Sequence, residues 1–275
     1  MELDGAVAVV TGGASGIGRA TALEFARRGA DVVVADVHEA RLDETQALLE
    51  EIGHGALAVR CDVTSDDDVD ALAQAAFARF GRVDVVMNNA GVAVLGPPHR
   101  VEIADWEWIL QVNLLGLVRG VRAFVPAMIE RGSGYVVNTA SVAGTWAYTW
   151  DAAPYITSKF AAYGFTETLA RTLRPQGIGV SVLCPGLVAT NLGETARYSG
   201  VPADRASEWS YFPPEMMVPV EPAAVGTMVC EAIRDERFAI FTHAEDAERF
   251  TTWRLDIEAS LSATIAQSPV PPRIV

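Results

Sequence analysis

Short apolar runs recur along the chain, between longer segments that have the periodicity of helices. The runs cover residues 7–10, 32–35, 56–60, 83–87, 135–139, 179–183 and 238–241. Continuous apolar runs of this length are typical of strands buried on both faces, as in parallel sheets. The alternation predicts an α/β fold: a doubly wound, mostly parallel, seven-stranded Rossmann-like sheet with helices on both faces. The 275 residues suffice for one such unit, and we expect a single domain over residues 1–275.

A glycine-rich turn follows the first strand, with the sequence Thr-Gly-Gly-Ala-Ser-Gly-Ile-Gly at residues 11–18. The next residues predict a helix whose inward side carries Ile17, Ala20, Leu23 and Ala26. Strand, glycine turn and helix together are the context of a dinucleotide-binding fingerprint. Gly12 would allow the tight turn, and Gly16 would let the backbone approach a pyrophosphate at the helix N-terminus. Gly18 would permit close packing of the helix on the strand.

The second strand ends in a carboxylate, Asp36. It lies 18 residues after Gly18, close to the usual position of the acid that binds an adenosine ribose. A carboxylate there accepts hydrogen bonds from the 2′-hydroxyl and repels a 2′-phosphate. Neither Ser15 in the glycine turn nor Val37 after the aspartate is basic. The sequence therefore predicts NAD rather than NADP.

Tyr155 and Lys159 stand four residues apart in the run Tyr-Ile-Thr-Ser-Lys. On a helix this spacing places both side chains on one face, one turn apart. An ammonium beside a phenol favours the phenolate, so we expect Lys159 to lower the pKa of Tyr155. A tyrosine with a lowered pKa can serve as a general acid or base.

Composition narrows the classes of partner and site. The net charge of −14 argues against a nucleic-acid or anionic-membrane partner. The four histidines are scattered without ligand spacing, so no metal site is expected. The three cysteines predict buried free thiols rather than a disulfide framework. The first strand begins near Met1 and no stretch looks able to span a membrane, so we expect a cytoplasmic protein.

Further motifs follow the strands in a fixed order: Asp62-Val63, Asn88-Asn89-Ala90-Gly91, Asn113, Ser141 and Pro185-Gly186. With the glycine turn and Tyr155-x3-Lys159, they make the chain resemble the short-chain dehydrogenase/reductase family from about residue 3 to 190, and more loosely to the C-terminus. The resemblance implies an NAD-dependent oxidoreductase that interconverts a secondary alcohol and a ketone, for which NAD carries the hydride.

The resemblance also implies a role for each catalytic residue. Tyr155 would give and take the proton at the substrate oxygen, and Lys159 would support it and hold the nicotinamide ribose. Ser141 would hydrogen-bond the same oxygen. Asn113, in an apolar helix over residues 106–125, would hold a water that links Lys159 to solvent.

The implied cofactor site gathers loops at the carboxyl ends of the strands. Asp62 would contact the adenine, Asn89 would mainly brace the sheet, and Val188 and Thr190 would meet the nicotinamide carboxamide. The full set of expected cofactor residues is Gly12, Ser15, Gly16, Ile17, Gly18, Asp36, Val37, Asp62, Val63, Asn89, Ala90, Gly91, Tyr155, Lys159, Pro185, Gly186, Val188 and Thr190.

Substrate identity is less constrained. Trp146, Tyr148 and Trp150, between Ser141 and Tyr155, could line an apolar pocket or pack elsewhere. The resemblance implies a substrate lid at about 188–220, whose apolar residues include Leu192, Tyr198, Trp209, Tyr211, Phe212, Met216 and Met217. A C-terminal helix, 244–266, and a tail to 275 complete the expected chain. The substrate is therefore expected to be apolar, aryl or alicyclic, in loose similarity to family members that act on bulky or aryl secondary alcohols.

Several alternatives stay open. A sugar, polyol or steroid dehydrogenase would use the same machinery with a different pocket. An NADPH-dependent ketoacyl-type reductase would need basic residues at 15 or 37. A non-catalytic NAD sensor would be expected to lose Tyr155, Lys159 or Ser141, and all are present. The resemblance implies a homodimer or homotetramer that pairs through helices near 105–130 and 154–174.

Overall fold

The computed structural model describes residues 1–202, 204 and 218–267. The expected lid residues Trp209, Tyr211, Phe212, Met216 and Met217 lie outside the described residues, as does the tail from residue 268.

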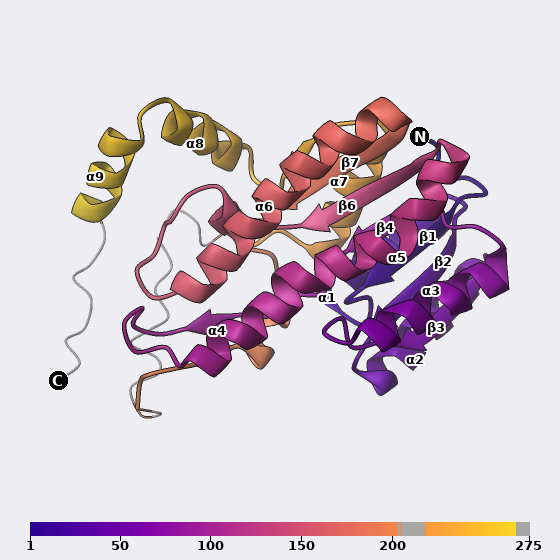
Figure 1. Cartoon of the computed structure of the whole chain (residues 1–275), viewed down its shortest axis with the longest axis horizontal. Coiled ribbons are helices and arrows are strands. Elements are labelled where there is room, and N and C mark those ends of the chain that lie inside the picture. The colour runs from indigo at the N-terminus through magenta and orange to yellow at the C-terminus, as the bar shows by residue number, and fades with distance from the viewer. Residues whose placement is uncertain (203, 205–217, 268–275) are drawn as a thin grey trace.

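Seven parallel strands form the central sheet, in the order β3-β2-β1-β4-β6-β7-β9 (Figure 1). The strands are β1 (Val7–Thr11), β2 (Asp31–Asp36), β3 (Ala56–Arg60), β4 (Val85–Asn88), β6 (Gly134–Thr139), β7 (Ile178–Cys184) and β9 (Ala239–Phe241). The order reverses direction between β1 and β4, as in doubly wound sheets. The predicted Rossmann-like fold is confirmed, and the strand ends agree with the predicted ones to within two residues.

Alternate residues of each strand enter opposite cores, which explains the continuous apolar runs. In β1, Ala8 and Val10 belong to one hydrophobic cluster, whereas Val7 and Val9 belong to another. The first cluster is covered by α1, α2 and α7, and the second by α3, α5 and α6. A strand enclosed in this way has no solvent face to carry polar residues.

Nine helices cover the sheet and its ends within the described part of the chain. They are α1 (Gly16–Arg27), α2 (Glu39–Ile52), α3 (Asp66–Phe80), α4 (Ile103–Leu110), α5 (Gly116–Arg131), α6 (Ala153–Leu173), α7 (Pro222–Arg234), α8 (Ala244–Leu255) and α9 (Ile257–Gln267).

The buried face of α1 differs from the predicted one. Thr21, Ala22 and Phe25 are fully buried with Ala26, whereas Ile17 and Leu23 are only partly buried. The helix packs against α7 as well as the sheet, so its covered side is wider than one stripe. Ile17 instead reaches the cavity described below.

Two features were not predicted. A small parallel sheet pairs β5 (Val94–Leu95) with β8 (Arg197–Tyr198), and strands this short leave no periodic signal. The helix expected over 244–266 is broken at Asp256, which has extended backbone dihedrals. Its carboxylate accepts a hydrogen bond from Ala259 N–H at 2.9 Å and so caps α9.

The helical run Ile103–Arg131 corrects one expectation. By length and composition it could cross a membrane, with a mean hydropathy of 1.5 over its most apolar window. Core helices of soluble proteins meet the same criterion. Phe124 and Met128 of this run are buried in the second cluster, and Leu117 is buried in a smaller cluster with Ala162 and Val182. The run contains a π-helical turn, Gln111–Leu115, which places Asn113 inward.

Candidate active site

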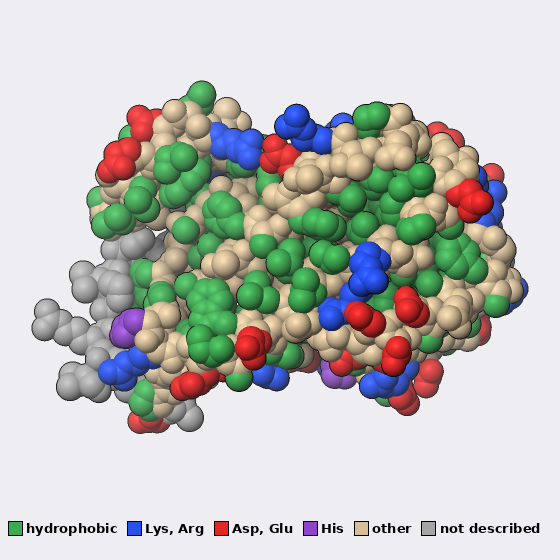
Figure 2. All heavy atoms as spheres, viewed as in Figure 1, with side chains coloured by type: hydrophobic (Ala, Val, Ile, Leu, Met, Phe, Trp, Pro, Cys, Tyr) green, Lys and Arg blue, Asp and Glu red, His purple; other side chains and the backbone are tan. Residues whose placement is uncertain are grey.

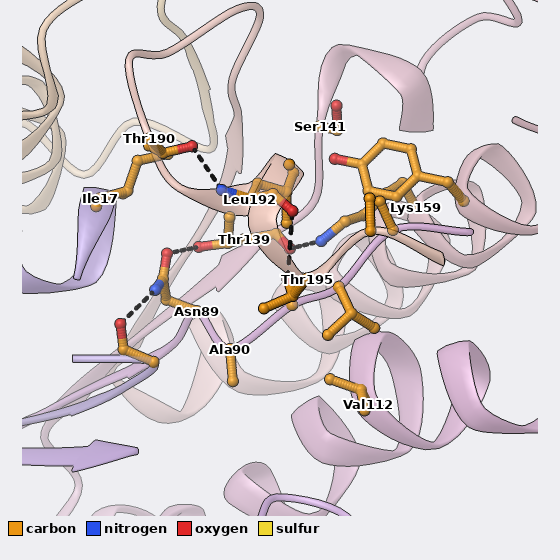
Figure 3. A pocket seen from close by; sticks show the side chains of 18 of the residues that line it. Ile17, Asn89, Ala90, Val112, Thr139, Ser141, Lys159, Thr190, Leu192 and Thr195 are labelled. Carbon is orange, nitrogen blue, oxygen red and sulfur yellow. Dashed lines mark hydrogen bonds between the residues drawn. The ribbon is translucent and has the colours of Figure 1, made fainter. Parts of the chain in front are cut away.

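A cavity of about 720 Å³ lies at the carboxyl ends of the central strands. It is lined by every expected cofactor residue except Gly18, and by Ser141, Tyr148 and Leu192. Trp146, Trp150 and Asn113 are not among its lining residues. The cavity runs from Asp36 at one end to Tyr155 at the other, and Figure 3 shows the side chains that converge on it.

The glycine turn forms the floor of the cavity. Gly12 and Gly16 have φ angles of 66° and 52°, which glycine adopts without strain. A Cβ at Gly18 would lie 2.1 Å from the Gly12 carbonyl oxygen, so no larger residue fits. Gly18 therefore serves by letting α1 approach the turn rather than by facing the cavity.

Asp36 is fixed at the rim beside this turn. Its carboxylate accepts hydrogen bonds from the N–H of Ala14 at 3.2 Å and of His38 at 3.1 Å. Ala14 belongs to the glycine turn and His38 follows β2, so backbone from two segments holds the carboxylate at the end of β2.

Asn89 braces three strand ends. Its amide donates to the Thr11 carbonyl at 3.2 Å, and its oxygen accepts from the Thr139 hydroxyl at 3.3 Å. Its backbone N–H donates to the Thr11 hydroxyl at 3.0 Å. The bonds connect the ends of β1, β4 and β6, in keeping with the bracing role expected for Asn89.

Asp62 and Val63 form the wall beyond β3. The Asp62 carboxylate accepts from the Thr64 N–H at 2.9 Å and from its hydroxyl at 2.8 Å. Val63 packs on α5, where a Cβ at Gly116 would lie 3.0 Å from a Val63 methyl carbon. Gly116 therefore allows this wall to approach the helix.

Ser141 and Tyr155 meet at the opposite end of the cavity. The Ser141 hydroxyl accepts from the Ala143 N–H at 3.1 Å and lies 3.3 Å from the Pro185 carbonyl oxygen. Burial raises the pKa of Tyr155, and a hydrogen bond with Ser141 opposes that rise. The pKa of Tyr155 is therefore raised, whereas the sequence analysis expected Lys159 to lower it.

Lys159 is buried on the same helix as Tyr155. Its Nζ donates to the Thr139 carbonyl at 3.1 Å (Figure 3). The same Nζ lies 5.7 Å from the centre of the Tyr155 ring. Burial lowers the pKa of Lys159 to about 8, because the charged ammonium loses its hydration. Lys159 is also the only lysine in the chain, a signal in the sequence that the motif analysis passed over.

Asn113 sits behind the cavity in the π-helical turn. Its amide donates to the Val92 carbonyl at 2.9 Å and to the Ser158 hydroxyl at 3.0 Å, and its oxygen accepts from the Val92 N–H at 2.8 Å. The side chain thus ties the loop after β4 to α6. The water-holding role expected for Asn113 stays a prediction.

The aromatic residues before Tyr155 differ in their surroundings: some pack in a buried cluster, and one also lines the cavity. Trp146 is buried with Val142, Ala143 and Ile156 in a cluster that also receives Trp253 of α8. Tyr148 belongs to the same cluster but also lines the cavity. Of the three expected aromatic pocket residues, only Tyr148 is positioned to meet a substrate.

Several lining residues were missed by the sequence analysis. Trp108 and Val112 come from α4 and the π turn, and Tyr198 comes from β8. Thr149 and Asp151 line the cavity near Tyr155, and the Thr149 hydroxyl donates to the fully buried Asp151 carboxylate. Within the described residues, no group of three or more His, Cys, Asp and Glu side chains could hold a metal ion.

Comparisons with known proteins agree with this geometry. The family model for short chain dehydrogenase matches residues 6–199. A cis-4-hydroxycyclohexanecarboxylate dehydrogenase from Sinomonas cyclohexanicum is 40% identical over 199 residues, which cover 72% of this chain and 77% of that protein. The "Probable oxidoreductase EphD" of Mycobacterium tuberculosis is 39% identical over 190 residues, 69% of this chain but only 32% of that longer protein.

A solved structure extends the similarity over the whole chain. The short chain dehydrogenase/reductase from Burkholderia phymatum in complex with NAD has a TM-score of 0.83 and 34% identity, and the match covers 100% of both chains. The chain therefore belongs to the short-chain dehydrogenase/reductase family of oxidoreductases.

Proposed function

We propose that this protein is an NAD-dependent oxidoreductase that interconverts a secondary alcohol and a ketone. One observation carries the proposal: Ser141, Tyr155 and Lys159 line the same cavity as the glycine turn and Asp36. A dinucleotide laid along this cavity would have its adenosine end at Asp36 and its reactive end at Tyr155.

The residues fit a nicotinamide dinucleotide. The positive φ angles at Gly12 and Gly16 turn the backbone at the N-terminus of α1, where a helix dipole favours phosphate. Gly91 lies near the catalytic end, where a Cβ would come within 3.4 Å of Lys159 Nζ. When bound, the cofactor supplies the hydride acceptor and donor.

Side chains of the protein would transfer the hydroxyl proton of the alcohol and stabilise the charge that develops on the substrate oxygen. Tyr155 would take the hydroxyl proton of an alcohol, or return it to a ketone oxygen, through its phenolic oxygen. Ser141 would donate a hydrogen bond to the same substrate oxygen, and its preorganised position reduces the reorganisation needed. Lys159, held at the Thr139 carbonyl, would stabilise the phenolate while it carries its proton.

Asp36 supports NAD over NADP. Its carboxylate faces the adenosine end of the cavity, where a 2′-phosphate would meet like charge. Arg41 of α2 lines the adjoining surface and is paired with Glu194 at 2.9 Å. That pairing reduces its ability to compensate a phosphate.

The substrate end supports an apolar, aryl or alicyclic alcohol. Leu95, Trp108, Val142, Tyr148 and Leu192 contribute apolar or aromatic surface to the cavity. The similar dehydrogenase from Sinomonas cyclohexanicum is named for cis-4-hydroxycyclohexanecarboxylate, an alicyclic secondary alcohol that carries a carboxylate. An alicyclic or aryl carbinol would bury its ring against such a wall.

Asp151 and Thr149 favour a second candidate, a polyol or sugar dehydrogenase. Both side chains line the cavity close in sequence to Tyr155 and present oxygens that hydrogen-bond hydroxyl groups. A polyhydroxylated substrate would use these oxygens where an aryl substrate would not.

The assembly and location belong to the same proposal. Figure 2 shows hydrophobic side chains gathered over α4, α5 and α6, and the exposed ones include Ile103, Leu115, Ile129 and Phe160. Pairing of two chains through α5 and α6 would cover this surface in a homodimer or homotetramer. We place the enzyme in the cytoplasm, with no nucleic-acid or membrane partner, in keeping with its net charge of −14.

The direct test is reduced-cofactor formation with a panel of aryl, alicyclic, steroid and polyol secondary alcohols, with NAD and NADP in parallel. The proposal expects turnover of aryl or alicyclic alcohols with NAD. Turnover of polyols alone would select the second candidate. Tight NADH binding without turnover of any alcohol would contradict both.

A further inference from the structure

A polar cluster, in part buried, lies behind the loop that follows β7. It consists of Thr242, His243, Asp246 and Arg249, where β9 passes into α8. Thr242 and Asp246 are buried, and only 18% of the His243 side chain is exposed. None of these residues lines the cavity, and none was singled out by the motifs.

The hydrogen bonds of this cluster have a defined direction. His243 Nε2 lies 2.9 Å from the Val218 carbonyl oxygen, which can only accept, so Nε2 carries the proton. In the neutral ring Nδ1 is then an acceptor, and it lies 2.9 Å from the Thr242 hydroxyl. That hydroxyl therefore donates to Nδ1 and accepts from the Gly186 N–H, which lies at 2.9 Å.

Gly186 is pressed against the same groups. A Cβ at this position would lie 2.6 Å from His243 Nδ1 and 2.8 Å from Asp246 Oδ2. Glycine therefore permits the loop after β7 to lie flat on the cluster. Asp246 in turn faces Arg249 at 3.5 Å and His243 at 3.7 Å, so its buried carboxylate has cationic and polar neighbours.

The chain of bonds extends to both sides of the loop. The Val220 N–H donates to the Leu187 carbonyl at 3.0 Å, and the Ala189 N–H donates to the Val220 carbonyl at 3.0 Å. On the catalytic side, the Pro185 carbonyl accepts from the Val142 N–H at 2.9 Å and lies 3.3 Å from the Ser141 hydroxyl. The loop 185–189 is thus clamped between the catalytic serine and the segment 218–220.

We propose that Thr242 and His243 are positioning residues that hold the loop 185–188 in the shape that receives the nicotinamide end of the dinucleotide. The inference rests on the proposed function, because it assigns that end of the cavity to the nicotinamide. Thr242 acts through the Gly186 N–H, and His243 acts through Thr242 and the Val218 carbonyl. Neither group touches the reacting atoms.

The test measures NADH binding by fluorescence titration, without any alcohol. Thr242→Val keeps the shape of the side chain but leaves the Gly186 N–H without its acceptor, so NADH should bind roughly tenfold more weakly. Thr251→Val is the matched control, since Thr251 is exposed on α8 and its hydroxyl donates within the helix, to the Ala247 carbonyl. The control should bind NADH within about twofold of the wild type.

Two histidine variants give a second measurement if Thr242→Val fails to fold. His243→Ala should weaken NADH binding by a similar factor. His243→Asn should restore most of it, because the amide oxygen takes the place of Nδ1 as the acceptor for Thr242. A purely structural role would instead lower the melting temperature and leave the NADH affinity of the folded protein unchanged.

The outcomes separate this inference from the proposed function. Unchanged NADH affinity in Thr242→Val and His243→Ala would overturn the positioning role while leaving the catalytic proposal in place. Weakened binding in both, with a wild type that turns over no alcohol, would support the positioning role and overturn the catalytic proposal. A wild type that binds neither NADH nor NADPH would overturn both.

Discussion

Lys159 is a buried amine, and its replacement should abolish catalysis while raising the free energy of unfolding at pH 7. Its side chain is 3% exposed, and burial lowers its pKa from the ordinary 10.5 to about 8. Lys159→Met keeps an unbranched chain of similar length but removes the ionisable group. Because no other lysine exists in the chain, a change in lysine titration belongs to this residue alone.

The direction in which stability changes with pH follows from how many protons the folded and unfolded states bind. The unfolded chain keeps the Lys159 proton up to about pH 10.5, and the folded protein keeps it only up to about pH 8. Between these values the unfolded state binds more protons, so the stability of the wild type rises with pH. Below pH 8 the full cost of the buried ammonium applies. A fall of roughly 2.5 in pKa corresponds to about 3 kcal/mol.

One favourable contact is lost with the amine. The bond from Lys159 Nζ to the Thr139 carbonyl contributes about 1 kcal/mol to stability. The net expectation is that Lys159→Met unfolds with a free energy about 2 kcal/mol higher than the wild type at pH 7. At pH 10 this advantage should have mostly disappeared, and catalysis should be lost at both pH values.

Urea unfolding of both proteins at pH 7 and pH 10 is the assay. Tyrosines and cysteines titrate in both proteins, so their contributions cancel when the two free energies of unfolding are subtracted. A less stable variant at pH 7, or a stability difference that does not change between pH 7 and pH 10, would contradict a destabilising buried ammonium at Lys159. Either result would show that Lys159 is well solvated by groups or water in the folded protein.

The remaining predictions concern the tyrosine, the cofactor acid and the aromatic segment. Tyr155→Phe should reduce turnover by at least about a hundredfold, as expected for loss of a general acid–base group, yet leave NADH binding measured by fluorescence nearly intact; substantial activity would remove Tyr155 from the proposed role. Asp36→Ala should narrow the preference for NAD over NADP, because it removes a charge that repels the 2′-phosphate; an unchanged ratio of kcat/KM values would contradict the ribose assignment. Trp146→Ala should destabilise the fold by about 3–5 kcal/mol in urea unfolding, since its ring is buried. Tyr148→Ala should raise KM for an aryl alcohol more than for a small aliphatic one, and equal effects would place Tyr148 in packing alone.

The sequence predicted those parts of the fold and site that depend on local patterns. Buried parallel strands have apolar residues on both faces, so the strand at Val7–Val10 could be predicted from its own residues, without knowledge of the adjacent strands. The glycine turn could also be predicted, because the positive φ angles at Gly12 and Gly16 permit few other residues. The approach of Gly18 to the Gly12 carbonyl leaves no room for a side chain.

Features that depend on distant contacts or irregular backbone could not be predicted. Trp146 and Tyr148 stand two residues apart in an irregular loop, where no periodicity tells which one faces the cavity. The pKa of Tyr155 depends on its burial, which the spacing to Lys159 does not reveal. The clamp on Gly186 joins residues 56 positions apart, and only the folded chain brings Thr242 to it.

The central claim is that Tyr155 and Ser141 serve hydride exchange between a carbinol carbon and a nicotinamide. The most direct measurement uses the best alcohol of the panel, labelled with deuterium at the carbinol carbon, and follows the label into the reduced cofactor by mass spectrometry. We expect stoichiometric transfer of deuterium to NADH by the wild type, and almost none by Tyr155→Phe or Ser141→Ala. Label that appears in water instead of NADH, or equal transfer by the variants, would contradict it.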